Sequence, residues 1–327
     1  MLLVMLVNEY IRYMEGIRRY SPRTVTVYSE ILEKFTSFAG ARDDGTLLES
    51  LTPQILRSYE VMLMDSEKLD PRTVNLHLSV LSGFCRYLVR QGSLASNPVR
   101  LVHRPRERKR LPEFYRSESM NEYFDATASE ASAENVSLVT GQDKVSRELV
   151  FRRLSRLVVS LLYSTGMRRS ELIGANLGDV DFSREAIRVR GKGDKEREIP
   201  LTHGICKEIL LYLETVGKFE GRERTAGEPL LQTLNGKRLY PVFVDRAVKR
   251  ELGQVGSITG RKSPHVLRHS LATALLNEGT DLNSIKELLG HSSLAATQVY
   301  THNSVSKLKK VYQTAHPRAK SGGKNGT

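Results

Sequence analysis

Three segments of this chain begin with a residue that can cap a helix, followed at once by proline. They are Ser21-Pro22, Thr52-Pro53 and Asp70-Pro71. Proline is favoured at the first position of a helix, because its fixed φ suits the helix and its missing N–H would have no partner there. Behind the first and third starts, apolar residues recur every three to four positions until Gly40 and Gly92 end the patterns. Residues 1–105 are therefore predicted to form a helical bundle.

The sequence from residue 113 onward is also mainly helical, with one clear exception. Segment 186–201 alternates apolar and polar residues on both sides of a Gly-Lys-Gly-Asp turn, which predicts a β-hairpin with Lys192 at its tip. Helices are predicted over 145–164, 204–216, 241–252, 265–278, 281–289 and 303–314. The acidic stretch 117–146 is predicted to form a helix followed by a mobile loop near 130–142. The fold class is thus mainly α with a small β-hairpin sheet.

A run of positive charge separates the two helical regions. Residues 104–110 read Arg-Pro-Arg-Glu-Arg-Lys-Arg, which is typical of an extended basic linker. The predicted organisation is an N-terminal helical domain over 1–105, a linker over 106–112 and a second domain over 113–327.

Charge and cysteine content narrow the functional classes. The 327 residues include 50 Lys+Arg against 37 Asp+Glu, a formal net charge of +13. This excess favours a polyanionic partner, nucleic acid before any other. The two cysteines, Cys85 and Cys206, lie in apolar periodic patterns far apart, which excludes a disulfide framework and a Cys-based zinc module. A reducing, cytoplasmic location is expected.

No stretch of the sequence predicts membrane insertion. Residues 1–7 are apolar, but a polar pair follows at once and no small-residue cleavage site appears, which argues against a signal peptide. No later apolar run approaches the roughly 20 residues that a helix needs to cross a bilayer.

Basic residues near helix starts and in the linker are candidates for DNA contact. The pentapeptides 21–25 and 70–74 each place Arg-Thr in a first helical turn, where free N–H groups could bind phosphate. The simpler interpretation is two ordinary capped helix starts and a solvated linker. The candidate DNA-binding residues are Arg23, Thr24, Arg72, Thr73, Arg106, Arg108, Lys109 and Arg110.

Six polar residues of the second domain together suit phosphodiester chemistry, although each alone is better explained by a structural role. They are Arg168, Lys192, His265, Arg268, His291 and Tyr300. Planar guanidinium groups can bind two phosphate oxygens at once and stabilise a penta-coordinate phosphate. A tyrosine nucleophile, whose pKa is near 10, needs help with its proton, which His265 or His291 could give. Lys192 could protonate the leaving 5′-oxygen.

No metal or cofactor is expected, because cationic side chains supply the charge stabilisation. His265, His269 and His291 could be imagined as zinc ligands. The sequence offers no nearby cysteine or carboxylate at the usual ligand spacing, which disfavours a zinc site.

The motifs that hold these residues resemble the tyrosine recombinases, and among them the Xer branch. Segment 165–172 resembles the family's first arginine box, which implies Arg168 as a catalytic residue. Segment 191–200 resembles its lysine hairpin and implies Lys192 rather than Lys195, while 265–269 resembles its His-x-x-Arg box. Leu289-Gly-His291 and Tyr300 resemble the remaining histidine and the nucleophile. Met167 stands where leucine is usual, and 117–146 is longer than expected of the connector.

The resemblance implies a clamp of two domains around duplex DNA. It implies cleavage and rejoining of a recombination site through a 3′-phosphotyrosyl bond to Tyr300 and a Holliday junction, by a homotetramer or heterotetramer on DNA. A DNA translocase is a further candidate partner. Resolution of chromosome or plasmid dimers is the expected purpose.

Three alternatives stay open on the sequence. A type IB topoisomerase shares the nucleophile and the clamp, but the N-terminal bundle and the C-terminal residues 316–319 argue against it. An integrase of a mobile element performs the same reaction for another purpose. A DNA-binding architectural protein would keep the fold without turnover.

Overall fold

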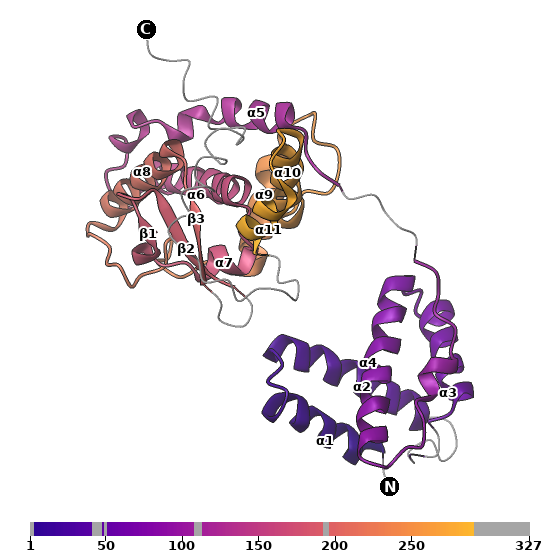
Figure 1. The fold of residues 1–327 in the computed structure, drawn as a ribbon. Coiled ribbons are helices and arrows are strands. Elements are labelled where there is room, and N and C mark those ends of the chain that lie inside the picture. The colour runs from indigo at the N-terminus through magenta and orange to yellow at the C-terminus, as the bar shows by residue number, and fades with distance from the viewer. Residues whose placement is uncertain (1–2, 41–47, 49–50, 108–112, 192–195, 291–327) are drawn as a thin grey trace. The chain divides into compact units, whose positions relative to one another are not determined.

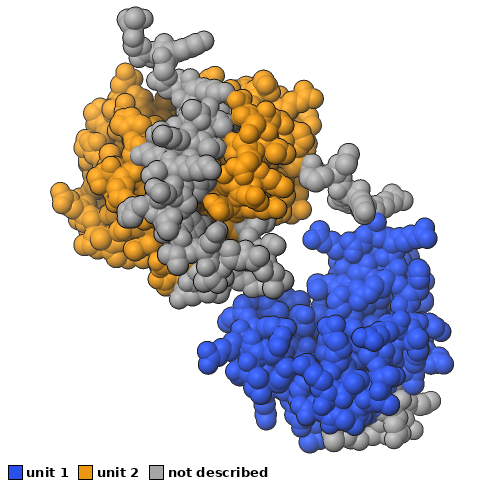
Figure 2. All heavy atoms as spheres, in the orientation of Figure 1, with its two compact units in different colours: residues 1–110 blue, residues 111–327 orange. Residues whose placement is uncertain are grey.

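The protein forms two compact units, each with its own hydrophobic core. A computed structural model describes residues 3–40, 48, 51–107, 113–191 and 196–290. The units are Met1–Arg110 and Leu111–Thr327 (Figure 2). The predicted helix at 303–314 lies outside the described residues.

Unit 1 is helical, as predicted. Its helices are α1 (Leu3–Gly16), α2 (Pro22–Gly40), α3 (Pro53–Val61) and α4 (Pro71–Arg90) (Figure 1). All three proline starts are confirmed. Thr52 accepts a hydrogen bond from the Ile55 N–H (3.3 Å), and Asp70 accepts one from the Arg72 N–H (2.9 Å), so these side chains satisfy amides that a helix start leaves unpaired.

The core of unit 1 is built around α4. This helix packs against α1, α2 and the turn after α3. Its buried residues recur at helical spacing and include Val74, Leu78, Leu81, Phe84, Cys85 and Leu88. Burial of this stripe against three neighbours holds the bundle together.

Unit 2 surrounds one central helix. Its helices are α5 (Ser117–Ala126), α6 (Lys144–Thr165), α7 (Arg169–Gly174), α8 (His203–Glu220), α9 (Pro241–Gly253), α10 (Pro264–Asn277) and α11 (Leu282–Leu289). Helix α6 packs against α8, α9 and α10, and every residue from 153 to 165 is buried. Figure 1 shows the sheet and α8 on one side of α6, with α9, α10 and α11 on the other.

A small antiparallel sheet completes unit 2. Strands β2 (Ala186–Arg190) and β3 (Glu196–Pro200) form the predicted hairpin, with Ile187 opposite Ile199. The sequence analysis missed a two-residue strand, β1 (Val180–Asp181), which pairs with β2. The fold class, mainly α with a small sheet, is confirmed.

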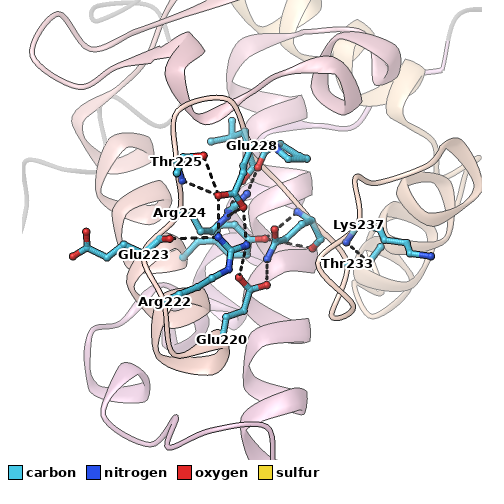
Figure 3. A network of polar contacts seen from close by, with 12 residues as sticks. Glu220, Arg222, Glu223, Arg224, Thr225, Glu228, Thr233 and Lys237 are labelled. Atoms are coloured by element: carbon cyan, nitrogen blue, oxygen red, sulfur yellow. Dashed lines mark hydrogen bonds and ion pairs between the residues drawn. The ribbon is translucent and has the colours of Figure 1, made fainter.

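An arginine network orders the connection between α8 and α9 (Figure 3). Arg222 donates to both oxygens of Glu228 (2.9 and 2.7 Å), and the nearly buried Arg224 donates to the carbonyls of Pro229 and Leu230. The Leu230 N–H then donates to the Ala175 carbonyl (2.9 Å), immediately after α7. The network therefore fixes the residues that support the C-terminal end of α7.

Segment 130–142 was predicted to be a mobile loop, but it is packed against the rest of unit 2. After α5 it forms two single 3₁₀ turns, and Val136 and Val139 are buried. Arg153 of α6 donates to the Ser132 carbonyl (2.6 Å). Apolar burial and this charged donor anchor a stretch whose polar composition suggested a free loop.

Two further predictions concern the state of the cysteines and the absence of a membrane-spanning helix. Cys85 and Cys206 are both buried, and no disulfide joins them. Among the helices of the described residues, none combines the length and apolar character that a bilayer crossing requires.

Leu78 provides a test of the core of unit 1. The side chain is 0% exposed in α4, so Leu78→Ala is expected to lower the free energy of unfolding by about 2–5 kcal/mol. Leu76 on the same helix is 44% exposed, and Leu76→Ala should change it by less than about 0.5 kcal/mol. Hydrogen–deuterium exchange of α4 peptides in the full chain measures both. Equal protection in the two variants would contradict this core assignment.

Candidate active site

Arg168 lies where the chain turns from α6 into α7. Helix α6 ends at Gly166, whose φ of +61° and close approach to Leu289 leave no room for a side chain: an added Cβ would lie 2.6 Å from Leu289 Cδ2. Arg168 then occupies the position before the first residue of α7. Its backbone N–H donates to Glu171 Oε2 (2.7 Å) and its Nη1 donates to Glu171 Oε1 (2.8 Å). Glu171 therefore fixes both the backbone and the guanidinium of Arg168.

Arg268 reaches the same place from α10. It is 6% exposed, and its two terminal nitrogens donate to the carbonyls of Gly166 (2.5 Å) and Leu289. Burial, and then the nearby charges of Arg168 and Arg197, lower the pKa of Arg268 to about 10. The guanidinium still carries its charge at neutral pH.

The two predicted catalytic arginines meet at the C-terminal end of α11. Arg268 donates to the Leu289 carbonyl, and Arg168 Nη2 donates to the Gly290 carbonyl (2.9 Å). The last carbonyls of a helix have no partner within the helix and carry its negative dipole end, so they attract cations. Two residues a hundred positions apart in sequence are thus held side by side.

Glu171 is a member of this site that the sequence analysis did not single out. The carboxylate is buried, and it accepts hydrogen bonds from Arg168 and from Arg197 of β3, whose Nη1 and Nη2 both lie 2.9 Å away. Burial acts to raise the pKa of Glu171, but the hydrogen bonds and charge of Arg197 and Arg168 outweigh it and lower this pKa to about 2. The carboxylate is therefore ionised throughout the neutral range.

Two signals in the sequence, which the analysis did not use, are typical of such residues. Glu171 follows Arg168 by three positions, which is the spacing of a side chain that bonds back to a helix start. Arg197 lies two positions before Ile199, so it shares the buried face of β3. A charged residue in phase with buried ones indicates a buried ion pair.

His265 lies in the first turn of α10, one turn before Arg268. Its Nε2 is 3.2 Å from Nε2 of His269, so one ring donates and the other accepts. Burial, then the positive neighbours His269, Arg268 and Arg261, lower the pKa of His265. The neutral ring, which can accept a proton, is therefore favoured at neutral pH.

Three predicted catalytic residues, Lys192, His291 and Tyr300, lie outside the described residues. Lys192 belongs to the connection between β2 and β3, and His291 directly follows Gly290. His291 is therefore next in sequence to a residue whose carbonyl accepts a hydrogen bond from Arg168.

The structure describes some, but not all, of the candidate DNA-binding residues of unit 1 and the linker. Arg23, Arg72 and Arg106 are exposed, whereas Arg108, Lys109 and Arg110 lie outside the described residues. The threonine amides of the two Arg-Thr starts are capped: Ser21 accepts from the Thr24 N–H (3.3 Å), and Asp70 accepts from the Thr73 N–H (3.1 Å). Ordinary capping thus explains the threonine amides, and the exposed arginine side chains stay candidates for phosphate contact.

The basic segment 104–110 was predicted to be an extended linker, but its first two residues contact α4. Asn75 donates to the Pro105 carbonyl (3.0 Å), and Arg104 donates to the Ser79 hydroxyl (3.0 Å). Residues 104 and 105 are therefore held against this helix.

The described residues contain no group of three or more His, Cys, Asp or Glu side chains that could hold a metal ion. The charged centre of unit 2 is instead composed of guanidinium groups around one carboxylate.

Comparison with known proteins gives two family matches. Residues 147–307 match the Phage integrase family, and residues 7–92 match the Phage integrase, N-terminal SAM-like domain. The chain is 36% identical over 318 residues to the tyrosine recombinase XerC of Chlorobaculum parvum, covering 95% of this chain and 94% of that protein. It is 36% identical over 321 residues to the tyrosine recombinase XerC of Bacillus pumilus, covering 96% and 97%.

Solved structures share the fold at lower sequence identity. The XerH site-specific recombinase bound to palindromic difH substrate has a TM-score of 0.66 at 19% identity, covering 94% of this chain and 84% of that chain. A lambda integrase dimer bound to a COC′ core site has a TM-score of 0.63 at 17% identity, covering 92% and 100%. At these identities the likeness concerns the fold alone. From the family matches and the near-complete alignment to the XerC proteins, the chain belongs to the phage integrase family and is a Xer-like tyrosine recombinase, an enzyme that transfers DNA strands.

Proposed function

We propose that this tyrosine recombinase cleaves a specific duplex site by attack of Tyr300 on a phosphate, and rejoins the strands through a Holliday junction. The observation that carries the proposal is the pairing of Arg168 and Arg268 at the end of α11, directly before the segment that contains His291 and Tyr300. Two fixed cations at one place suit the negative charge that a penta-coordinate phosphate develops.

Arg168 and Arg268 each keep N–H donors that their contacts with the described part of the protein do not use, and these donors can bind a phosphate. A guanidinium has five N–H groups. Within the described residues, the side-chain contacts of Arg268 and of Arg168 each use two terminal nitrogens on protein acceptors. These contacts fix the orientation of each group, and the remaining N–H groups can bind non-bridging oxygens without reorganisation of the site.

The chemical step requires two proton transfers. Tyr300 loses its phenolic proton to His265 or His291 as its oxygen bonds to phosphorus, and the bond from phosphorus to the 5′-oxygen breaks. Lys192 donates a proton to that oxygen, which leaves a free 5′-hydroxyl and a 3′-phosphotyrosyl bond. Attack by the 5′-hydroxyl of the other strand reverses these transfers and releases Tyr300.

The similar proteins support a proposal for the substrate, the assembly and the biological purpose. The aligned proteins are named tyrosine recombinase XerC, and the XerH structure contains its palindromic difH substrate. By analogy, this protein acts as a tetramer of one or two kinds of subunit on a DNA site, resolves chromosome or plasmid dimers, and takes a DNA translocase as its activator. In this proposal unit 1 and the linker hold the duplex through Arg23, Arg72, Arg106, Arg108, Lys109 and Arg110, with Thr24 and Thr73 beside them.

The nucleophile provides the first test. Sheared genomic DNA is incubated with the protein in EDTA, and covalent adducts are isolated under denaturing conditions and sequenced. The wild type is expected to retain DNA at one sequence through a 3′-phosphotyrosyl bond, whereas Tyr300→Phe retains none. Tyr240→Phe, which alters a half-exposed tyrosine of unit 2, should behave as the wild type.

Other outcomes identify the alternatives. Specific binding without any adduct would support an architectural protein. Efficient relaxation of plasmids that lack the recovered sequence would support a topoisomerase. An adduct that persists in Tyr300→Phe would refute the assignment of the nucleophile.

The arginine pair provides the second test. Arg268→Lys is expected to reduce the single-turnover cleavage rate of a nicked duplex carrying the recovered site by about 10²–10³-fold, because a lysine cannot reproduce the planar fork that binds two oxygens. The dissociation constant for the same duplex should change little. Arg246→Lys, an exposed position on α9, is the matched control. An undiminished rate in Arg268→Lys would exclude Arg268 from the phosphate site.

His265 provides a pH test. If the neutral ring accepts the proton of Tyr300, the cleavage rate should rise with pH while His265 loses its own proton and then level off. Because burial and the positive neighbours lower the pKa of His265, the midpoint of this rise should lie below about pH 6.5, the ordinary value for histidine. His265→Gln should be slower and lose the rise, whereas His203→Gln, with a side chain 88% exposed, should keep it. A rise that persists in His265→Gln would point to His291 instead.

A further inference from the structure

Arg197 is a buried arginine that the reaction as proposed does not use. It lies on β3, and its side chain is 6% exposed. Its terminal nitrogens bind both oxygens of Glu171 (2.9 Å each), and its Nε donates to the Leu288 carbonyl (3.1 Å). Removal of a guanidinium from water is costly, so this residue requires the buried carboxylate as its partner.

Three successive carbonyls at the end of α11 each accept a hydrogen bond from a different arginine. Arg197 binds Leu288, Arg268 binds Leu289 and Arg168 binds Gly290. The three side chains come from β3, α10 and the start of α7. One helix terminus is therefore the common anchor of the two arginines proposed to bind phosphate and of Arg197.

Gly290 permits this close approach. Its φ is +63°, and an added Cβ would lie 3.0 Å from Cζ and Nη1 of Arg197. The planar face of the guanidinium thus packs on a backbone position that only glycine fills without a shift.

Glu171 is shared between two arginines. Arg197 binds it through both oxygens, while Arg168 reaches only Oε1 with its side chain. An arginine beside an unoccupied carboxylate tends to bind both oxygens. Without Arg197, the side chain of Arg168 would be drawn onto Glu171, away from the Gly290 carbonyl and from a phosphate.

We propose that Arg197 is a positioning residue of the recombinase: it holds both oxygens of Glu171, so that the Arg168 guanidinium stays directed toward the scissile phosphate. The same side chain ties the hairpin that carries Lys192 to the end of α11. This inference rests on the proposed function, because it gives Arg168 the role assigned there.

The test uses the full chain and the nicked duplex defined by sequencing of the trapped DNA. Arg197→Met is expected to slow single-turnover cleavage by roughly 100-fold, the scale of a displaced catalytic group, while the dissociation constant for the duplex changes less than about threefold. The matched control is Arg190→Met on the same hairpin, whose side chain is 66% exposed, and it should cleave as the wild type does.

A second substitution separates positioning from simple loss of structure. Glu171→Gln removes the carboxylate charge that competes for Arg168, so the double variant Arg197→Met/Glu171→Gln should cleave at least about tenfold faster than Arg197→Met. A residue with only a structural role predicts the opposite, since each further loss in one buried network slows the reaction or leaves it unchanged.

The conservative variant covers the case in which Arg197→Met does not fold. Arg197→Lys keeps the buried charge but cannot bind both oxygens in the planar fork, so it should cleave about tenfold more slowly than the wild type with unchanged DNA affinity. Circular dichroism melting identifies which variants are folded at the assay temperature. Addition of Glu171→Gln should speed Arg197→Lys as well.

Each outcome decides one of the two proposals. A folded Arg197 variant that cleaves at the wild-type rate, or one that Glu171→Gln does not accelerate, overturns the positioning role. A wild type that forms no adduct at Tyr300 overturns the proposed function instead, before any Arg197 variant is compared.

Discussion

One ionised carboxylate inside unit 2 balances the cluster of guanidinium groups on which the site depends. Glu171 is 4% exposed and lies between Arg168 and Arg197, and its charge also favours the charged form of Arg268. Three cations against one anion leave an excess of positive charge, which the dipole end and carbonyls of α11 offset only in part. The site is thus electrostatically prepared for an anion, and a DNA phosphate suits it.

The elements around this site were predictable wherever the signal is local. A capping residue followed by proline fixes a helix start within a few positions, so α2, α3 and α4 begin where the sequence indicates. Strict alternation on both sides of a glycine-containing turn identified β2 and β3. By contrast, β1 has only two residues, too few for any periodicity, and its pairing with β2 is a tertiary contact.

The composition of the site was predictable only in part. Arg168, His265 and Arg268 were found because their spacing in motifs resembles a known family. Glu171 and Arg197 were missed, since their importance lies in a contact between residues 26 positions apart that joins two different elements. The 130–142 segment shows the same limit: its polar composition suggested a mobile loop, whereas Val136, Val139 and the buried Arg153 hold it in place.

The shared anchor also constrains how the site can form. Displacement of the end of α11 would break hydrogen bonds to Arg197, Arg268 and Arg168 together, and hydrogen bonds to charged groups contribute about 1.5–3 kcal/mol each. Movement of one arginine alone would leave a buried carbonyl or a buried charge unpaired, which is equally costly. The three arginines, strand β3 and the C-terminal end of α11 therefore change position as one cooperative unit, so a partial arrangement of the site is disfavoured relative to the complete one.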